Sequence, residues 1–216
     1  MNKPTSPLSP DHDCQICPRL ADFREQCRAQ YPDKFNAPVP SFGPLGAEIL
    51  IVGLAPGLKG ANFTGRPFTG DFAGELLYST LLKYGLAKGE FKARADDGLE
   101  LINCRITNAV RCLPPENKPI GSEINNCRPF LVSQIDHMPN LKIILSLGLV
   151  SHNTVLKTFG EKLSAHKFAH QAKHELQNGL TLIDSYHCSK YNTSTKRLTE
   201  PMFHDVFEFI KKTLAH

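Results

Sequence analysis

The chain has 216 residues, of which 41% are hydrophobic and 21% charged, a composition that is typical of globular proteins and excludes a disordered chain. No apolar run reaches the ~18–20 residues that a membrane-spanning helix needs. The N-terminal residues also lack the apolar segment of a secretory signal, so we expect a cytoplasmic protein. The 25 Lys and Arg exceed the 21 Asp and Glu, and the resulting net charge of +4 is compatible with a polyanionic partner.

The first 86 residues predict a tail, two helices and one strand. Residues 1–13 are expected to form a flexible tail, and apolar residues at a spacing of three to four predict a helix within 15–35. A short continuous apolar run at 48–52, followed by glycine, is typical of a buried parallel strand. The Gly-rich loop 53–74 comes next, and helical spacing returns over 75–86.

The rest of the chain continues this alternation. Further buried strands are predicted at 104–110, 142–147 and 180–184, and helices at 123–137 (capped by Ser122), 149–159 and 200–214. Four apolar strands alternating with helices indicate the α/β class, as a three-layer α/β/α fold around a central, mainly parallel, four-stranded sheet. Because no segment has the composition of a linker, residues 14–216 are expected to form a single domain.

The seven cysteines suggest metal binding more than disulfide bonding, because their number is odd and no signal sequence is recognisable. Two lie in a C-x2-C pair with no apolar run beside it, and two more flank a Pro- and Asn-rich segment. The candidates for a shared four-thiolate site are Cys14, Cys17, Cys112 and Cys127. Zinc and an iron–sulfur cluster both accept four thiolates, and the spacing does not choose between them. Small buried hydrophobic residues are the alternative, which suits Cys27 and Cys104 better.

Polar loops follow three of the predicted strands, at 53–74, 108–119 and 185–192. Ligands of parallel sheets bind beyond the carboxyl ends of the strands, so these loops are the predicted site. The Gly-rich loop contains neither a P-loop nor a G-x-G-x-x-G motif, which disfavours a nucleotide-dependent enzyme. Its glycines instead allow backbone amides to approach a flat or anionic ligand.

Individual residues of these loops have a structural and a functional interpretation. Asp71 either caps the following helix or faces a ligand, and Phe68 either anchors the loop in the core or stacks on an aromatic ligand. His187 comes directly after a strand end, where a side chain faces the cleft. The three histidines of 166–174 recur at intervals of four; a solvated basic stretch explains them better than a metal site.

Six blocks of sequence, in order along the chain, resemble the uracil-DNA glycosylase superfamily: GLAPG (53–57), GANFTGRPFTGD (60–71), RITNAVRCLPPENKP (105–119), NNC (125–127), SLG (146–148) and SYHCSKYNTSTKRLT (185–199). The likeness extends from about Cys14 to Met202 and is greatest to the iron–sulfur branch called family five. Sister family four carries an acidic residue in the first block and usually no carboxylate after the second. Here the first block has Leu54 and Ala55, and Asp71 ends the second. Family five is therefore indicated, with family four as the near alternative.

The resemblance implies hydrolysis of the N-glycosidic bond of uracil in DNA, which leaves an abasic site. It also implies a [4Fe-4S] cluster on the four candidate cysteines. In the implied roles, Asp71 orients or activates water and offsets positive charge on the sugar, while His187 donates to uracil O2. Asn108 reads the Watson–Crick edge of the base, and Phe68 stacks on it. The remaining base-binding contacts come from the glycine motif, at Gly53, Ala55 and Gly57.

DNA recognition is expected to involve extrusion of the target base, which is easier for a mispaired uracil such as U opposite G. The residues implied in DNA contact are Arg66, Ser189, Asn192, Lys196 and Arg197. A monomer is the expected state. Gly57 stands where strict uracil enzymes of the superfamily have a bulky Tyr, so a broader range of deaminated or C5-substituted bases is expected.

Two positions depart from the family pattern. Cys188 replaces the usual Pro after His187, and Phe63 stands at a position that is commonly Arg. Neither change affects the implied acid or the base-reading amide. The alternatives to a glycosylase are a catalytically weak iron–sulfur protein that binds damaged DNA and a hydrolase of free nucleosides.

Overall fold

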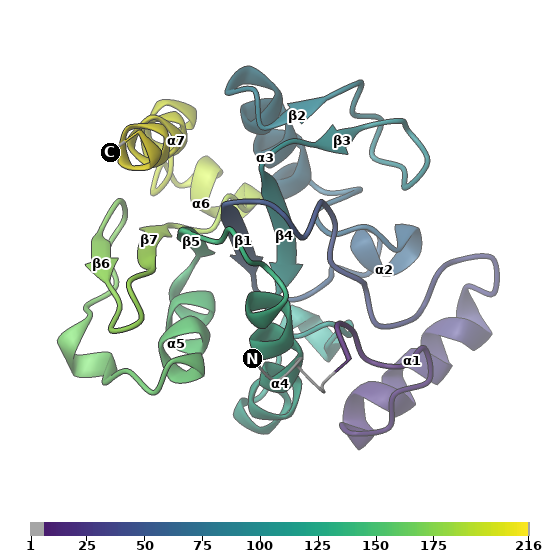
Figure 1. Cartoon of the computed structure of the whole chain (residues 1–216). Helices are drawn as coiled ribbons and strands as arrows, with labels where there is room; N and C mark the ends of the chain where they lie inside the picture. Colours follow the sequence, from purple (N-terminus) through teal and green to yellow (C-terminus); the bar gives the residue numbers. More distant parts are fainter. Residues whose placement is uncertain (1–6, 216) are drawn as a thin grey trace.

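The computed structural model describes residues 7–215, which fold around a five-stranded sheet in the order β4-β1-β5-β7-β6 (Figure 1). Four strands are parallel: β1 (Ile49–Gly53), β4 (Cys104–Asn108), β5 (Ile143–Leu147) and β7 (Thr181–Ser185). The fifth, β6 (Lys173–Glu175), pairs antiparallel with β7 at the sheet edge. The α/β class and the mainly parallel sheet are confirmed, while the predicted number of four strands is wrong. With three polar residues, β6 lacks the apolar run that marks the buried strands.

Helices cover both faces of the sheet, as Figure 1 shows. They are α1 (Pro18–Gln30), α2 (Ala61–Thr64), α3 (Phe72–Lys83), α4 (Gly121–Asp136), α5 (Leu149–Thr158), α6 (Lys190–Ser194) and α7 (Glu200–Leu214), with 3-10 turns at Pro115–Asn117 and Leu163–Ala165. Ile49 and Ile51 of β1 pack with α3 and α7, whereas Leu50 and Val52 pack with α4 and α5. Side chains alternate across a strand, so one short apolar run supplies both cores and three layers result.

Local details differ from the predictions in three places. Helix α3 begins earlier than expected, at Phe72, because Asp71 is its N-cap. Helix α4 begins at Gly121, so Ser122 is inside it; the Glu123 carboxylate accepts the N–H of Ile120 at 2.9 Å and satisfies the helix start instead. A two-residue ribbon, β2 (Ala87–Lys88) with β3 (Glu100–Leu101), was not expected, because such short strands have no recognisable period.

The predicted tail lies partly outside the described residues, which begin at 7. Within it, the Leu8 carbonyl accepts hydrogen bonds from Gln134 and Arg111, and Asp13 forms an ion pair with Arg28 at 2.7 Å. Its flexibility stays a prediction. Among the helices that the structure describes, none combines the length and the apolar composition needed to span a bilayer.

Candidate active site and thiol pocket

The polar loops converge at one edge of the sheet, as expected. A pocket of about 280 Å³ lies beyond the carboxyl ends of β1, β4 and β7. It is lined by Ala55, Pro56, Gly57, Ala61, Phe68, Asp71, Ala73, Asn108 and His187. An outer groove of about 940 Å³ shares four of these residues and continues to Lys59, Asn117 and Ser189. A small inner pocket therefore opens into a wider groove.

Asn108 brings an unsatisfied acceptor into the inner pocket. It is the last residue of β4, in register with Gly53 of β1, and it is only 4% exposed. Its Oδ1 has no hydrogen-bond partner among residues 7–215. A Cβ at Gly53 would collide with this oxygen and would lie 2.6 Å from Phe68 Cζ, so only glycine leaves room for both side chains. A buried acceptor without a partner in a pocket indicates that a ligand donor completes it.

Phe68 is held in an uncommon backbone conformation, with a φ of 56°. This left-handed region costs an aromatic residue about 1–3 kcal/mol, and such strain clusters at functional sites. The buried Tyr78 hydroxyl donates to the Pro67 carbonyl at 2.7 Å, and a Cβ at Gly74 would overlap the Phe68 carbonyl. The Phe68 ring stacks on His187 with a centroid distance of 6.1 Å. Phe68 thus belongs to the core and to the pocket wall at once.

The two oxygens of the Asp71 carboxylate have different surroundings, the start of α3 and the pocket. Oδ1 accepts the N–H of Gly74 at 2.9 Å, which makes Asp71 the N-cap of α3. Oδ2 lies on the pocket side, 3.7 Å from where a Cβ at Gly57 would stand. Asp71 is exposed and lines both the inner pocket and the outer groove. Because the cap fixes the side chain, the second oxygen is held where the two cavities meet.

His187 lines the same two cavities as Asp71. Burial lowers the pKa of His187, and the nearby negative charge of Asp71 opposes this effect without reversing it. The imidazole is therefore neutral at neutral pH and presents one N–H donor. Next to it, Cys188 is fully buried, with its sulfur directed at the Ala73 carbonyl. Burial raises the pKa of Cys188, so this thiol is a packing residue of the turn and an unreactive one.

Two of the predicted DNA-contacting residues stabilise the turn after His187. The Ser189 hydroxyl accepts the N–H of Asn192 at 3.4 Å and caps α6. The Asn192 side chain in turn donates to the His187 carbonyl at 2.8 Å. These contacts fix the direction in which His187 enters the pocket, while Ser189 also borders the outer groove.

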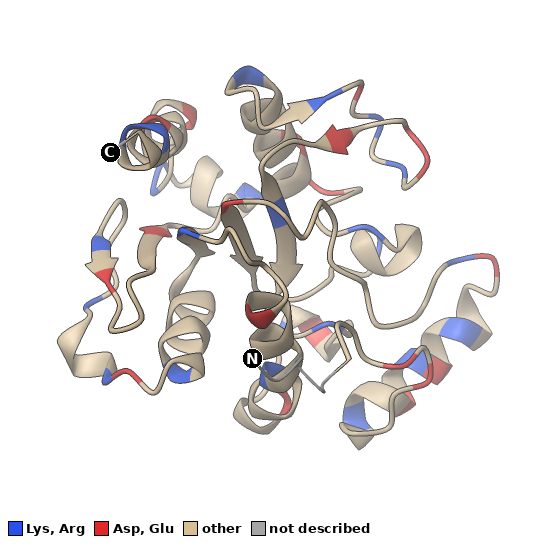
Figure 2. Ribbon diagram, viewed as in Figure 1, with Lys and Arg blue, Asp and Glu red and all other residues tan. Residues whose placement is uncertain are grey.

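The outer side of this segment combines positive charge with aromatic surface. Lys196 and Arg197 are exposed, and the Arg197 guanidinium lies 4.7 Å from the centre of the Tyr186 ring. Tyr191 is 74% exposed and was not singled out from the sequence, although a large aromatic residue in a basic loop is a recognisable signal. Elsewhere, Lys and Arg are dispersed among acidic residues over the helices and loops (Figure 2).

The prediction that Arg66 contacts DNA is contradicted by its burial. Arg66 is 3% exposed and forms two hydrogen bonds, of 2.7 and 2.6 Å, to the Asp97 carboxylate. Its guanidinium also lies 5.2 to 5.6 Å from the ring centres of Phe42, Tyr78 and Phe91. From the sequence alone, an Arg in a Gly-rich polar loop is expected to be an exposed cation. Its acidic partner, Asp97, is 31 positions away and cannot be recognised from the neighbouring residues. In the fold, the pair ties this loop to the segment between β2 and β3.

Replacing Arg66 with Met should strongly destabilise the fold. The substitution leaves the buried Asp97 carboxylate without its counter-charge, and breaking a buried pair in this way costs about 3–5 kcal/mol. The matched control is Arg94→Met, which breaks the exposed Arg94–Asp96 pair of similar geometry and should cost less than about 1 kcal/mol. Urea denaturation measures both, and equal losses would contradict the assignment.

The same pair should make the fold sensitive to acid. The Arg66 hydrogen bonds hold the pKa of Asp97 well below its usual value. A carboxyl group whose pKa is lower in the folded state contributes stability above its unfolded pKa of about 3.9, and this contribution is lost as the pH falls towards the folded pKa. The melting temperature of the wild-type protein should therefore fall more steeply below about pH 4 than that of Arg66→Met. Parallel curves would show that Asp97 does not carry the dependence.

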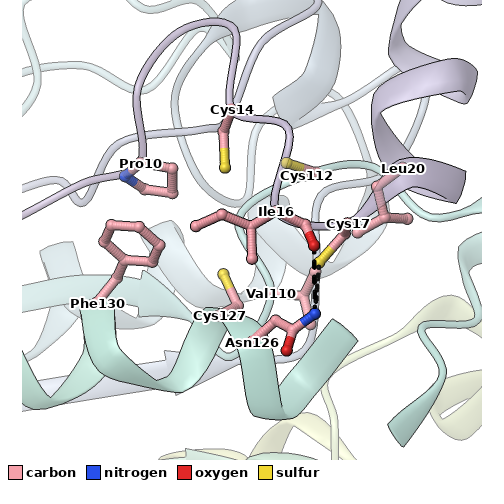
Figure 3. Close-up of a pocket in the computed structure, with 10 residues that line it drawn as sticks. All are labelled: Pro10, Cys14, Ile16, Cys17, Leu20, Val110, Cys112, Asn126, Cys127 and Phe130. Carbon is pink, nitrogen blue, oxygen red and sulfur yellow. Dashed lines mark hydrogen bonds between the residues drawn. The ribbon is translucent and has the colours of Figure 1, made fainter. Parts of the chain in front are cut away.

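The four candidate thiols converge on one pocket of about 320 Å³ (Figure 3). Cys14 and Cys17 come from the segment that leads into α1, Cys112 from the loop after β4, and Cys127 from α4. Their sulfur atoms are directed into the space between these elements in Figure 3. Apart from Asn126, the pocket is closed by apolar residues: Pro10, Ile16, Leu20, Val110 and Phe130. Apart from the Asn126 amide, the four thiols are therefore the side-chain groups of this pocket that could bind a metal.

The surroundings of the thiols suit metal ligation. Burial raises the pKa of Cys112 to about 12 and that of Cys127 to about 11, so a metal would have to displace protons from them. The backbone N–H of Arg111 points at the Cys127 sulfur from 3.3 Å, and the Asn126 amide approaches the Cys17 sulfur at 3.6 Å. Donors of this kind stabilise metal-bound thiolates.

The histidines of 166–174 belong to a hydrogen-bonded network. His174 on β6 pairs with Asp184 Oδ2 at 3.0 Å, and His152 Nδ1 of α5 pairs with Asp184 Oδ1 at 2.8 Å. The other nitrogen of His152 pairs with the His166 carbonyl at 2.9 Å. The expectation of a solvated stretch is wrong for His174, whose partner Asp184 is fully buried, whereas much of the stretch around it is exposed. The side chains of His152, His174 and Asp184 lie close enough together to hold a metal. However, each Asp184 carboxylate oxygen is already hydrogen-bonded to one of these two histidines, so the network is a structural link between α5, β6 and β7.

The fold, the strand-end pocket and the thiol pocket define a class of protein. It is a three-layer α/β protein with a small strand-end pocket, which offers a carboxylate, an imidazole and a buried amide with an unpaired oxygen, and with a separate pocket of four thiols. A family model described as the uracil DNA glycosylase superfamily matches residues 40–211. The chain belongs to this superfamily.

Similar proteins indicate which branch of the superfamily this chain resembles most. The type-5 uracil-DNA glycosylase of Thermus thermophilus is 41% identical over 204 residues, which cover 92% of this chain and 93% of that protein. The type-5 uracil-DNA glycosylase of Mycobacterium leprae is 38% identical over 207 residues, with 92% and 90% coverage. A type-4 uracil-DNA glycosylase of Pyrobaculum aerophilum is 34% identical over 151 residues, with 69% and 63% coverage. Of these three, the type-5 proteins are the more similar, in agreement with the pattern of the first two motifs.

Proposed function

We propose that the protein is a uracil-DNA glycosylase of base-excision repair, which hydrolyses the N-glycosidic bond of uracil and leaves an abasic site. The observation that supports this most is the buried, unpaired Oδ1 of Asn108 in a pocket walled by Phe68. Uracil offers an N3–H donor to Oδ1 and an O4 acceptor to the amide nitrogen, and its flat ring can stack on Phe68. Cytosine presents the reverse pattern, an N3 acceptor and an N4–H₂ donor, so in the same amide orientation it would leave Oδ1 without a donor, at the cost of a buried unsatisfied acceptor.

The two connected cavities suit a base that has been turned out of the double helix. The flipped uracil would enter the inner pocket past Gly53, Ala55 and Gly57, while the adjoining sugar and phosphates would occupy the outer groove. Flipping costs a few kcal/mol and less for a mispaired base, which favours U opposite G as substrate. Lys196 and Arg197 are the proposed phosphate contacts, with Ser189 and Asn192 supporting the turn that carries them.

In the proposed chemistry, two side chains each stabilise one of the two charges that develop as the bond breaks. As the bond from C1′ to N1 breaks, the base takes the electron pair and the sugar becomes positive. The free oxygen of Asp71 offsets that positive charge and orients the water that adds to C1′. His187 donates its N–H to uracil O2, where negative charge develops, assisted by backbone amides of the 53–57 turn. Water supplies hydroxide to the sugar, and the proton that it loses balances the one taken up by the base.

We further propose that the four thiols hold a [4Fe-4S] cluster. The four sulfurs meet at one pocket, and the resemblance of the motifs to the iron–sulfur branch of the superfamily supports a cluster there. Zinc also accepts four thiolates, so the metal content distinguishes the two. When bound, the cluster would act as a cross-link between the α1 segment and α4, beside the Arg19–Glu123 ion pair of 2.7 Å.

The proposed function is tested with a duplex that carries one U opposite G. Incubation with the purified protein followed by alkaline treatment should cleave the strand at the uracil. Binding without cleavage would favour a damage-binding protein, and release of uracil from free uridine but not from DNA would favour a nucleoside hydrolase. Iron and acid-labile sulfide should be present at about four of each per chain. We expect a monomer, because one chain carries both cavities, and a cytoplasmic location.

Substituting Gly57 by Tyr should narrow the range of bases that are excised. A Cβ at Gly57 meets nothing closer than Asp71 Oδ2 at 3.7 Å, so a side chain can be built there and would occupy the pocket entrance. Uracil, without a C5 substituent, should keep at least about a tenth of its rate, while 5-hydroxymethyluracil and hypoxanthine should lose more than about 100-fold. Competition assays on matched duplexes measure the ratio, and an equal loss on every base would contradict a steric role for this position.

A further inference from the structure

Arg24 is a buried cation with unused hydrogen-bond donors. It is 5% exposed, and one terminal nitrogen, Nη1, donates to the Cys14 carbonyl at 3.0 Å. Nε and Nη2 have no hydrogen-bond partner in the described part of the chain. The Glu25 carboxylate stands 3.6 Å from Nε, beyond hydrogen-bond distance, and is largely exposed. A guanidinium in this state is costly, and buried donors of this kind normally face an acceptor.

The hydrogen bond to the Cys14 carbonyl places the Arg24 guanidinium next to the segment that carries Cys14, although Arg24 itself does not line the thiol pocket. On α1 it lies one turn after Leu20, which lines that pocket, and shares the buried face of the helix with it. Side chains on a helix lean towards its N-terminus, where Cys14 and Cys17 stand. The contact with the Cys14 carbonyl has this direction.

Arg111, the other buried arginine beside these thiols, is already engaged elsewhere. Its guanidinium donates to the Val39 carbonyl at 3.1 Å and to the Leu8 carbonyl at 3.5 Å. Its contribution to the pocket is the backbone N–H that points at Cys127. Between these two arginines, Arg24 is thus the one whose guanidinium has buried nitrogens without a partner among residues 7–215.

We propose that Arg24 is a positioning residue for the cluster, donating its free N–H groups to cluster sulfur and supplying a buried counter-charge. This inference rests on the cluster assigned under the proposed function. Hydrogen bonds to sulfur and local charge set the reduction potential of iron–sulfur centres, and surrounding donors of this kind commonly hold a metal site in place. The cluster would in turn supply the acceptors that residues 7–215 do not offer to Nε and Nη2.

The test compares the holoprotein with Arg24→Met and Arg24→Lys. The Met variant removes both charge and donors, so its reduction potential should become more negative, and a chelator should extract iron on the order of tenfold faster. The Lys variant keeps the charge, so its reduction potential and its rate of iron loss should lie between those of the wild type and of the Met variant. Fe–S stretching bands in resonance Raman spectra should shift on transfer to D₂O in the wild type and lose that shift in the Met variant.

The matched control is Arg28→Met, one turn further along α1, where the side chain pairs with Asp13 and Glu25 instead. This variant should keep the wild-type potential and Raman shift. If the Met variant does not fold, the Lys variant decides by the same readouts. Wild-type potential, iron retention and Raman shift in the folded Arg24 variants would overturn the inference, whereas wild-type protein without iron would overturn the cluster itself.

Discussion

Replacing Asp71 with Asn should lower the rate of uracil excision by on the order of 10²–10⁴-fold while the protein stays folded. Asn retains an oxygen for the Gly74 N–H and is among the preferred N-cap residues, so α3 keeps its start. The change removes the negative charge that would face the sugar. Single-turnover excision from a U·G duplex measures the rate, and a thermal melt of the same sample reports the fold.

The companion variant Asp71→Ala separates capping from chemistry. It loses the cap as well as the charge and should be less stable than the Asn variant by about 1 kcal/mol. Both variants should excise uracil equally slowly and bind the duplex as the wild type does. An Asn variant with a near-normal rate, or rates that follow stability across the two variants, would show that Asp71 serves α3 alone.

Replacing Asn108 with Ala should abolish most excision without the stability loss expected for a buried Asn. The substitution removes the amide that would read uracil, so the excision rate should fall by roughly 10²-fold or more. It also removes an acceptor that has no partner among residues 7–215, so no hydrogen bond is broken at Oδ1. The free energy of unfolding should change by less than about 1 kcal/mol.

The matched control for Asn108 is Asn62→Ala, at a buried Asn whose amide is paired. Asn62 Nδ2 donates to Asn36 Oδ1 at 2.8 Å, and both residues are buried. Its replacement leaves the buried Asn36 Oδ1 without its donor and should cost about 1–3 kcal/mol. Excision and urea denaturation are measured on both variants. Comparable destabilisation in the two would mean that Asn108 has a structural partner, and an active Asn108→Ala would exclude it from base recognition.

The strands illustrate how far a sequence can predict this fold. The four parallel strands were located because strands buried on both faces must be continuously apolar, and β1, β5 and β7 are buried at every position. Strand β6 and the β2–β3 ribbon have two or three residues each and no such signal. Their pairing depends on neighbours brought close by the rest of the sheet.

The candidate site was predicted unevenly. Asp71, Asn108 and His187 were placed together because strand ends of a parallel sheet meet at one edge and because their motifs resemble a known superfamily. The two interpretations of Asp71 were treated as alternatives, yet the side chain has two oxygens and the structure uses one for the cap. Arg66 was misassigned, since its sequence neighbours are polar and its true partner, Asp97, is distant.

By itself, the sequence determined the α/β class, the main strands, the set of four thiols and the membership that the comparisons support. These features depend on local periodicity and on residue types at short spacing. Only the tertiary structure decided that Arg66 is buried, that the buried Oδ1 of Asn108 has no partner among residues 7–215, and that the same holds for Nε and Nη2 of Arg24. Each of these depends on which distant atoms surround a side chain, because solvation and hydrogen bonding are properties of the assembled neighbourhood.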